Sequence, residues 1–582
     1  MSADLPPSGT SDGAFGSPST DPPADDPATA APATGDDTPS SNQHGVVTRR
    51  RVLLGVGAAA GLGAGAWAAR GLAGTAATPR RRPRRPSTTT TRPAAVTMTA
   101  LASGVEIPVA AWVVAENLRP GTLDWLVSRV AGARVIEGFA DTVSAAAGDD
   151  VVVFATTPAA SFHVEAYRMG WYQGTGARLV WRSATAPGMV QPAATVAPDT
   201  AMVACRWVPS TVVPVTDSWP PGSYLLKLVA ADGGQGFVPL CVRDDTSSAA
   251  FVIQSSVTTW QAYNRWGGHS LYVGPGNASA TRARVVSFDR PYQYGWAWGA
   301  ADFIGNELPL IQLAEHLGLD VSYSTDVDLH LRGELLLRHR TLISLGHDEY
   351  WSQAMRTAAT TARDQGVNLA FLGANACYRH VRLQPAPTGP ARQQVCYKTD
   401  FEHQDPLWGV DPAEVTANWP DGPVPRPEQE LIGASYADID ANADLVVADP
   451  TAWVLVGTGL AAGAHIPGFY QGEYDHFTPA LGPTNADVVA HSPVANRGPG
   501  AFADMTYYTA PSGAGVFDTG SAAFVNTLYQ GSSVPPAVIR TSGQVAATAP
   551  LLGRMVENIF SVFGAGPAGL THPSSGTWRK VY

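Results

Sequence analysis

The sequence predicts a multidomain fold in which an antiparallel β-sandwich, of the Ig-like kind, precedes a doubly wound α/β domain. Three observations predict it. Short runs of alternating apolar and polar residues, separated by Gly, Pro and Asp, fill residues 105–247. In residues 248–582, apolar strand-like runs alternate with helical spacing, which is typical of a parallel sheet. The chain of 582 residues is also too long for one hydrophobic core.

The N-terminal part of the chain carries no sign of a folded domain. Residues 1–47 are rich in Ser, Thr, Pro, Ala and Asp with almost no large apolar side chain, so we expect disorder. In residues 48–75, the consecutive arginines Arg49 and Arg50 precede a weakly apolar stretch of Ala and Gly, the pattern of a twin-arginine export signal. Residues 76–104 are expected to form an extended linker, since they are rich in Pro, Arg and Thr.

The export signal predicts an extracytoplasmic protein, either secreted or tethered to the membrane. An ordinary transmembrane anchor is the alternative, because the apolar stretch is just long enough to span a bilayer. Its Ala and Gly residues contribute little transfer free energy, which favours a signal. We expect membrane contact only through this segment, if it is not cleaved. The sequence leaves cleavage and the oligomeric state open.

The strands of the predicted sandwich show a period of two. Phe162, Val164 and Ala166 alternate with more polar neighbours, and residues 151–154 form a short apolar run. A further strand, residues 223–229, follows a Pro-Pro-Gly turn. Short strands with such punctuation favour two packed antiparallel sheets.

The α/β domain is predicted from three apolar runs, at residues 250–254, 341–346 and 367–373. Helical spacing occupies residues 302–318, between the first two runs, and a further helix is expected to begin near Ser352. Parallel strands connected in this way end at one common edge of the sheet, where ligands of open α/β sheets bind.

Charge and cysteine content exclude several function classes. The net charge of −11 gives no support to nucleic-acid binding. The four cysteines have no C-x-x-C spacing, so a zinc knuckle or a thioredoxin-like site has no basis. Pairing Cys205 with Cys241 and Cys377 with Cys396 would keep each disulfide inside one domain and is our preference. Free buried thiols are the alternative.

Polar residues follow two of the predicted strands. The first segment, His347–Trp351, offers an imidazole, two carboxylates and a phenol, and the second is Gly373–Tyr378. A plainer interpretation is that Asp348 caps the next helix and Tyr350 packs against it. A third segment, Gly472–His476, is also a candidate, although it could be a solvated loop.

Cys377 suggests a nucleophile, because it follows a predicted strand as the cysteine of a nucleophile elbow does. Such an elbow needs glycines two residues before and after the nucleophile, and here Asn375 and Arg379 stand there instead. The pattern therefore disfavours a nucleophilic role.

Five segments together resemble the large (beta) subunit family of N,N-dimethylformamidase and its exported relatives: Tyr167–Tyr172, Ser324–His330, His347–Trp351, Gly373–Asn375 and Glu473–Asp475. The resemblance covers roughly residues 130–565. It implies a C-terminal domain similar to the class I glutamine amidotransferase fold, in agreement with the alternation of strands and helices. Asp348 and His476 depart from the proline and arginine of the family's motifs.

The resemblance also implies a metal centre. In the enzyme for which the family is named, two tyrosines and one glutamate hold an iron that activates water to hydrolyse an amide. Tyr350 and Glu473 match one tyrosine and the glutamate. The second tyrosine is Tyr397 or Tyr378, and we favour Tyr397. Phenolate and carboxylate oxygens are hard donors that suit a ferric ion, which would keep positions for water and substrate.

His347 and Glu349 are the expected proton acceptors, since they flank the predicted ligand Tyr350. We therefore predict an exported, iron-dependent hydrolase of a C–N amide-type bond with a small-molecule amide as substrate. The alternative is a non-catalytic envelope protein that binds glycan through tryptophans, although such rings equally suit a packed core rim. The tryptophans in question are Trp260, Trp266, Trp296 and Trp298.

Overall fold

The structure, a computed structural model, describes residues 97–128, 135–295, 297–528 and 545–582. The chain divides into two compact units at Ser87, and all described residues belong to the second, Thr88–Tyr582. The predicted disordered segment, the twin-arginine signal and residues 76–96 of the linker lie outside the described residues. Within the described ranges, no helix combines the length and the apolar character needed to span a membrane.

The end of the predicted linker is paired backbone. Strand β1 (Met98–Ala100) lies antiparallel to β2 (Glu106–Pro108). The helix α10 (Val545–Ala565) packs against β2, so the start of the described chain contacts its C-terminal part.

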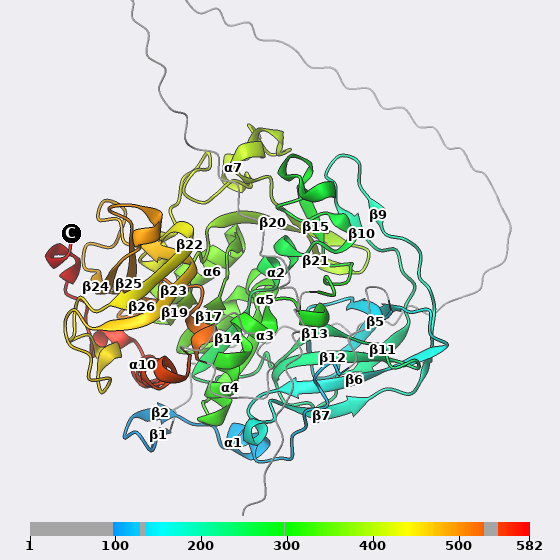
Figure 1. Cartoon of the computed structure of the whole chain (residues 1–582), viewed down its shortest axis with the longest axis horizontal. Helices are drawn as coiled ribbons and strands as arrows, with labels where there is room; N and C mark the ends of the chain where they lie inside the picture. Colours follow the sequence, from blue (N-terminus) through cyan, green and yellow to red (C-terminus); the bar gives the residue numbers. More distant parts are fainter. Residues whose placement is uncertain (1–96, 129–134, 296, 529–544) are drawn as a thin grey trace, which may run out of the picture. The chain divides into compact units, whose positions relative to one another are not determined.

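The N-terminal part of the described chain contains two sheets (Figure 1), which share one hydrophobic core. One has the order β11-β5-β3, and the other has the order β4-β13-β12-β6-β7 with β8 paired to β6. Apolar side chains from alternate positions of both sheets, such as Val153, Val164 and Leu226, meet between them. The strands of this region are β3 (Glu137–Ala140), β4 (Ser144–Ala146), β5 (Asp150–Thr156), β6 (Ser161–Met169), β7 (Ala177–Arg182), β8 (Ala186–Pro187), β9 (Thr195–Val196), β10 (Val203–Ala204), β11 (Thr211–Pro214), β12 (Gly222–Ala230) and β13 (Gln235–Arg243).

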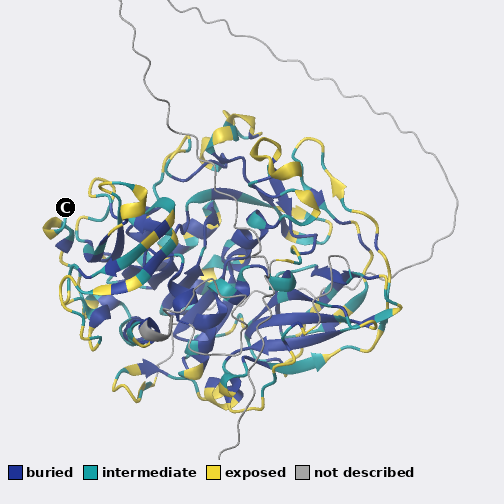
Figure 2. Cartoon of the chain, in the orientation of Figure 1, coloured by how far each residue is buried: buried dark blue, intermediate teal, exposed yellow. Residues whose placement is uncertain are grey.

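A seven-stranded sheet forms the centre of the rest of the chain, with the order β16-β14-β17-β19-β26-β25-β24. Neighbouring strands are parallel from β16 to β26 and antiparallel from β26 to β24, so the sheet is mixed where the sequence predicted a parallel one. Figure 2 shows the middle strands as buried. The strands are β14 (Phe251–Ser255), β16 (Val321–Thr325), β17 (Thr341–Gly346), β19 (Asn368–Gly373), β24 (Asp487–Pro493), β25 (Phe502–Thr509) and β26 (Gly515–Asp518).

Helices cover both faces of this sheet. Alternate strand residues pack with α4 (Leu308–His316) and α10 on one face and with α6 (Gln353–Asp364) on the other. The helix α6 begins next to Ser352, as the sequence predicted, and Ser352 caps it, because its side chain accepts a hydrogen bond from the backbone of Met355. The other helices are α1 (Ala111–Asn117), α2 (Val257–Tyr263), α3 (Phe303–Asn306), α5 (Asp326–Arg332), α7 (Lys398–Phe401), α8 (Gln429–Ile432) and α9 (Phe524–Thr527).

Two smaller sheets lie beside the C-terminal ends of the parallel strands. One has the order β15-β21-β20-β18, and the other pairs β22 with β23. Their strands are β15 (Val285–Ser287), β18 (Tyr350–Ser352), β20 (Arg379–Ala386), β21 (Gly389–Val395), β22 (Ser435–Val446) and β23 (His465–His476).

A buried ion pair joins the N-terminal sheets to the α/β region. Arg168, on β6, lies 2.5 Å from Glu315, on α4, and both side chains are fully buried. Apolar residues of β12 and β14, such as Leu225 and Phe251, also share one core. The parts on either side of the domain boundary predicted at residue 247 therefore pack against each other.

Candidate functional site

The loop after β17 turns sharply at the edge of the sheet. Gly346 has a φ of 59°, and a Cβ there would lie 2.7 Å from neighbouring backbone, so only glycine fits without a shift. Asp348 accepts hydrogen bonds from Gln254 and Ser344, each of 2.8 Å, and burial raises its pKa to about 6. The predicted cap role of Asp348 is wrong, because Ser352 caps α6.

His347 lies between two carboxylates. Its Nε2 is 2.8 Å from Glu473 Oε2 and 3.2 Å from Glu349 Oε2. Burial alone would lower the pKa of His347, but these carboxylates raise it well above its usual value. Glu473 lies on β23, which pairs with β22, so the segment Gly472–His476 is a strand and not a solvated loop.

Asn375, in the turn after β19, also contacts Glu473. Its Nδ2 donates a hydrogen bond of 3.0 Å to Glu473 Oε2, and its backbone N–H donates to Asp475. Asn375 has a φ of 55°, in the left-handed region that asparagine tolerates better than most residues. Its Oδ1 is buried and has no hydrogen-bond partner among the described residues, which leaves an acceptor for a ligand.

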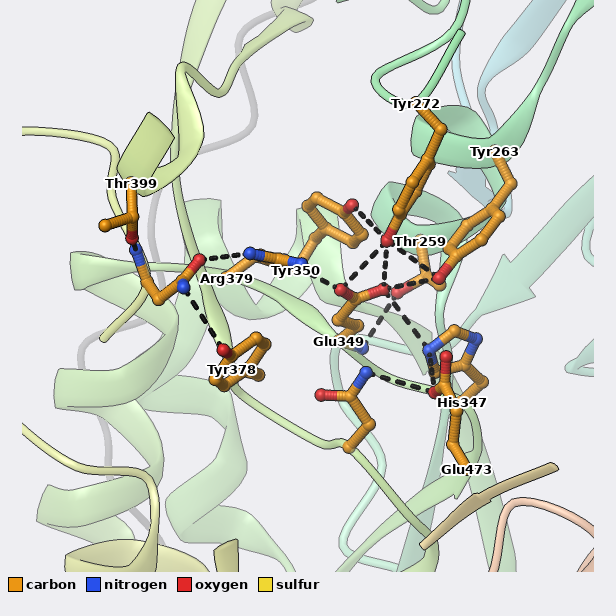
Figure 3. A network of polar contacts seen from close by, with 12 residues as sticks. Thr259, Tyr263, Tyr272, His347, Glu349, Tyr350, Tyr378, Arg379, Thr399 and Glu473 are labelled. Atoms are coloured by element: carbon orange, nitrogen blue, oxygen red, sulfur yellow. Dashed lines mark hydrogen bonds and ion pairs between the residues drawn. The ribbon is translucent and has the colours of Figure 1, made fainter. Parts of the chain in front are cut away.

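Two phenols donate to Glu349, and a third is hydrogen-bonded to one of them (Figure 3). The Tyr350 hydroxyl donates to the Tyr272 oxygen over 2.7 Å, and the Tyr272 and Tyr263 oxygens are also 2.7 Å apart. Tyr272 and Tyr263 each lie 2.9 Å from Glu349 Oε2. Burial and the charge of Glu349 raise the pKa of all three phenols well above the usual value, so they are protonated in this arrangement.

Glu349 is the charged centre of this network. Burial would raise its pKa, but His347, Arg379 and Lys398 lower it to about 2. Arg379 Nε donates to Glu349 Oε1 over 3.0 Å. Lys398 Nζ lies 3.2 Å from the centre of the Tyr272 ring, and burial and Arg379 hold the pKa of Lys398 well below its usual value.

The two candidates for the second tyrosine lie apart from the three phenols. Tyr397 packs with Val285 and Val395, whereas the preceding residue, Cys396, packs in the cluster that contains Tyr350. The side chain of Tyr397 therefore packs in a different cluster from that of Tyr350. Tyr378 accepts a hydrogen bond from Asn418, and its ring lies 5.0 Å from that of Tyr436. The structure thus brings together the predicted residues His347, Glu349, Tyr350 and Glu473, but not Tyr397.

The preferred disulfides are not formed. All four cysteines are free and buried, because each packs in a different apolar cluster. Cys377 has a φ of 57°, as a strained elbow would, but burial raises the pKa of its thiol to about 12. A thiol with such a pKa is a poor nucleophile, in agreement with the sequence pattern.

The tryptophans considered for glycan binding are mostly engaged in packing. Trp260 is buried against Tyr292 and Phe303. Trp266 donates a hydrogen bond to Glu137 from its indole nitrogen, and Trp298 is half-buried. Trp296 lies outside the described residues.

The side chains around Glu349 offer mainly oxygen atoms as donors, and the type of donor determines which metal ion they could bind. Within the described ranges, no three His, Cys, Asp or Glu side chains are arranged to hold a metal ion. A metal would therefore need phenol oxygens, which Tyr350, Tyr272 and Tyr263 provide. Phenolate and carboxylate oxygens are hard donors, so the side chains fit a ferric ion by their chemistry.

Sequence reasoning missed the two phenols that accompany Tyr350. Tyr263 ends α2 and Tyr272 lies in the loop after it, and neither belongs to a motif that follows a strand. Arg379 and Lys398 were also missed. Their one signal was proximity to quoted motifs, since Arg379 follows Tyr378 and Lys398 follows Tyr397.

Comparison with known proteins gives one informative match. A family model described as N,N-dimethylformamidase beta subunit-like, C-terminal, matches residues 163–535. No curated protein matches. Among solved structures, a cycloisomaltooligosaccharide glucanotransferase from Paenibacillus sp., complexed with cycloisomaltoheptaose, is 15% identical over 20% of this chain and 15% of its own, with a TM-score of 0.12. That likeness is too slight to inform fold or function.

Proposed function

This chain belongs to the N,N-dimethylformamidase beta subunit-like family, and from that membership we propose that it is an iron-dependent hydrolase of a C–N amide-type bond in a small molecule. The observation that carries the proposal is the network in which His347 bridges Glu349 and Glu473, and in which the Tyr350 phenol is connected to Glu349 through the Tyr272 hydroxyl. Its acidic and phenolic oxygens lie at the edge where open α/β sheets bind ligands.

Tyr350 and Glu473 would hold the iron, with Tyr272 or Tyr263 as the second phenol because Tyr397 lies outside their network. When bound, the ion would polarise an amide carbonyl and lower the pKa of a water. Neutral His347 could accept a proton from this water at Nε2. Glu349 and Glu473, which lie beside Nε2, would then stabilise the protonated imidazole. Asn375 orients Glu473 by donating to its Oε2.

The side-chain exposures agree with a site that admits a small molecule. His347 and Glu473 retain 12% and 18% exposure, whereas Glu349 retains 1%. A substrate would therefore approach from the side of Glu473, while Glu349 stays in the interior and orients the imidazole. Of the tryptophans considered for glycan binding, the structure describes Trp260, Trp266 and Trp298. These three form no exposed row of rings, so they do not support the glycan-binding alternative.

Tyr350→Phe tests the proposal. The purified protein is expected to contain iron and to show visible phenolate-to-iron charge-transfer absorption, which Tyr350→Phe should abolish with the fold intact. Tyr397→Phe is the matched control, since it removes a buried hydroxyl outside the network and should keep the colour. A metal-free protein with no amide hydrolysis after iron loading would reject the proposal.

The finer fold description belongs to the same proposal. We propose that the two N-terminal sheets form an Ig-like sandwich, supported by the shared core between them. The seven-stranded sheet would be a doubly wound, glutamine amidotransferase-like domain, supported by its parallel strands and by the helices on both faces.

Export by the twin-arginine route is a further part of the proposal, supported by Arg49 and Arg50 before a weakly apolar stretch. This route carries folded proteins, so an iron could be loaded in the cytoplasm. Replacing both arginines with lysine should leave the protein in the cytoplasm, as measured by cell fractionation. Normal export of that variant would remove the claim.

A further inference from the structure

A polar cavity lies apart from the Glu349 network, between the connection of β9 to β10 and the segment before β15. Its volume is about 370 Å³, within the range of small-molecule sites. Two arginines, Arg282 and Arg284, line it together with His269, Thr281 and Gln404. Asp199 is the one carboxylate in its lining among the described residues.

The two guanidinium groups lie against the same aromatic ring. Their central carbons are 4.4 Å and 3.6 Å from the centre of the Phe401 ring, for Arg282 and Arg284 respectively. Arg282 is paired with Asp400 at 2.5 Å and also donates to the backbone oxygen of Tyr397. Its charge is therefore compensated within the protein.

The charge of Arg284 is less completely compensated. Arg284 forms no ion pair among the described residues, and its Nη1 donates only to the backbone oxygen of Arg282, over 2.6 Å. Burial and the neighbouring charge of Arg282 lower the pKa of Arg284, and the charge of Asp400 offsets this only in part. A half-buried cation beside a second cation is destabilising unless an anion joins them.

Unused donors support the same conclusion. Arg282 Nη1 and Arg284 Nε are buried and have no acceptor among the described residues. An unsatisfied buried donor is destabilising, more so when it is charged, and such groups are rare in folded proteins.

We propose that this cavity binds a small oxyanion, a phosphate or carboxylate group, between Arg282 and Arg284. Planar guanidinium groups bind both oxyanions through paired hydrogen bonds, and Thr281, His269 and Gln404 add polar contacts at the wall. The site is independent of the proposed hydrolysis. The cavity is nevertheless connected to the Glu349 network through one short segment. Arg282 donates a hydrogen bond to the backbone oxygen of Tyr397, and the next residue, Lys398, lies over the Tyr272 ring.

Thermal unfolding and calorimetric titration of the full chain test this, with inorganic phosphate and acetate added separately at constant ionic strength. One of the two anions is expected to bind and to raise the Tm. Preference for phosphate would indicate a phosphate ester as ligand, and preference for acetate a carboxylate. Arg284→Met should weaken binding at least about tenfold, because it keeps the apolar stem and removes the charge.

Two further variants make the test specific. Arg284→Lys, which keeps the charge but loses the planar fork, should bind with intermediate affinity. Arg182→Met is the matched control, since this largely exposed arginine pairs with Glu165 in another region and should leave anion binding unchanged. Absence of binding by both anions, or equal binding by Arg284→Met, would overturn the proposal.

Discussion

Two buried clusters of this molecule contain the same kinds of side chain but differ in how completely they are satisfied. In the first, Arg168 donates to both oxygens of Glu315, to the Tyr172 hydroxyl and to the backbone of Pro221. Arg168 and Glu315 are fully buried. We call this the closed cluster.

The second is the network around Glu349, which we call the open cluster. One imidazole there faces two carboxylates, and Asn375 Oδ1 has no partner among the described residues. His347 and Glu473 remain partly exposed. Shifted phenol pKa values occur in both clusters, since burial raises the pKa of Tyr172 and of Tyr350. A raised phenol pKa therefore does not distinguish a structural cluster from a functional one. Unpaired hydrogen-bond acceptors and access to solvent do distinguish them.

Breaking the closed cluster is expected to have the largest effect on stability. Glu315→Gln leaves the Arg168 charge buried without its partner, which should lower the free energy of unfolding by about 3–5 kcal/mol. Denaturant titration measures this loss. Arg182→Met, which breaks a largely exposed ion pair, is the control and should cost less than about 1 kcal/mol. Equal effects of the two variants would erase the contrast.

Acid is expected to lower the free energy of unfolding by an intermediate amount, because the buried ring of His339 must then take up a proton. His339 Nδ1 lies 2.7 Å from the Ala249 backbone oxygen, and burial lowers the pKa of His339 to about 4. The unfolded chain then binds the proton first, so stability falls as the pH drops from about 6.5 to 4, by up to about 3 kcal/mol. His339→Gln should flatten this part of the stability profile between pH 7 and 4. An unchanged profile would contradict the expectation.

Changing the open cluster should affect stability least. Glu473→Gln keeps the shape of a partly exposed side chain and leaves His347 beside Glu349, so the free energy of unfolding should change by less than about 1 kcal/mol. Iron content and amide hydrolysis should nevertheless be lost. Glu414→Gln, at a half-buried glutamate elsewhere, should leave both unchanged. A large loss of stability in Glu473→Gln would make the open cluster structural.

The central strands could be predicted because their apolar runs are continuous and short. The runs at residues 250–254, 341–346 and 367–373 correspond to β14, β17 and β19, and Ser352 correctly predicted the start of α6. The antiparallel strands β24 and β25 could not be placed, since pairing partners distant in sequence leave no local signal.

Half of the residues of the site could be predicted from the sequence, for a similar reason. His347, Glu349 and Tyr350 follow a recognisable strand, and Glu473 lies in a motif of the family. Tyr272 and Tyr263 depend on a long-range approach of α2 to that loop. The position of Tyr397 could not be predicted, because the sequence does not show which residue of this segment packs with Tyr350; in the structure that residue is its neighbour Cys396.

The four free thiols have a practical consequence for measuring motion. Cys205, Cys241, Cys377 and Cys396 are 8%, 3%, 0% and 1% exposed, so an alkylating reagent reaches each only when its surroundings open. Their labelling rates in native buffer therefore measure local opening at four depths, with no introduced probe. Cys205 and Cys241 report on the N-terminal sheets, and Cys377 and Cys396 on the turns around the open cluster. Because no bond joins the thiols, a reductant should leave the Tm of the folded chain unchanged.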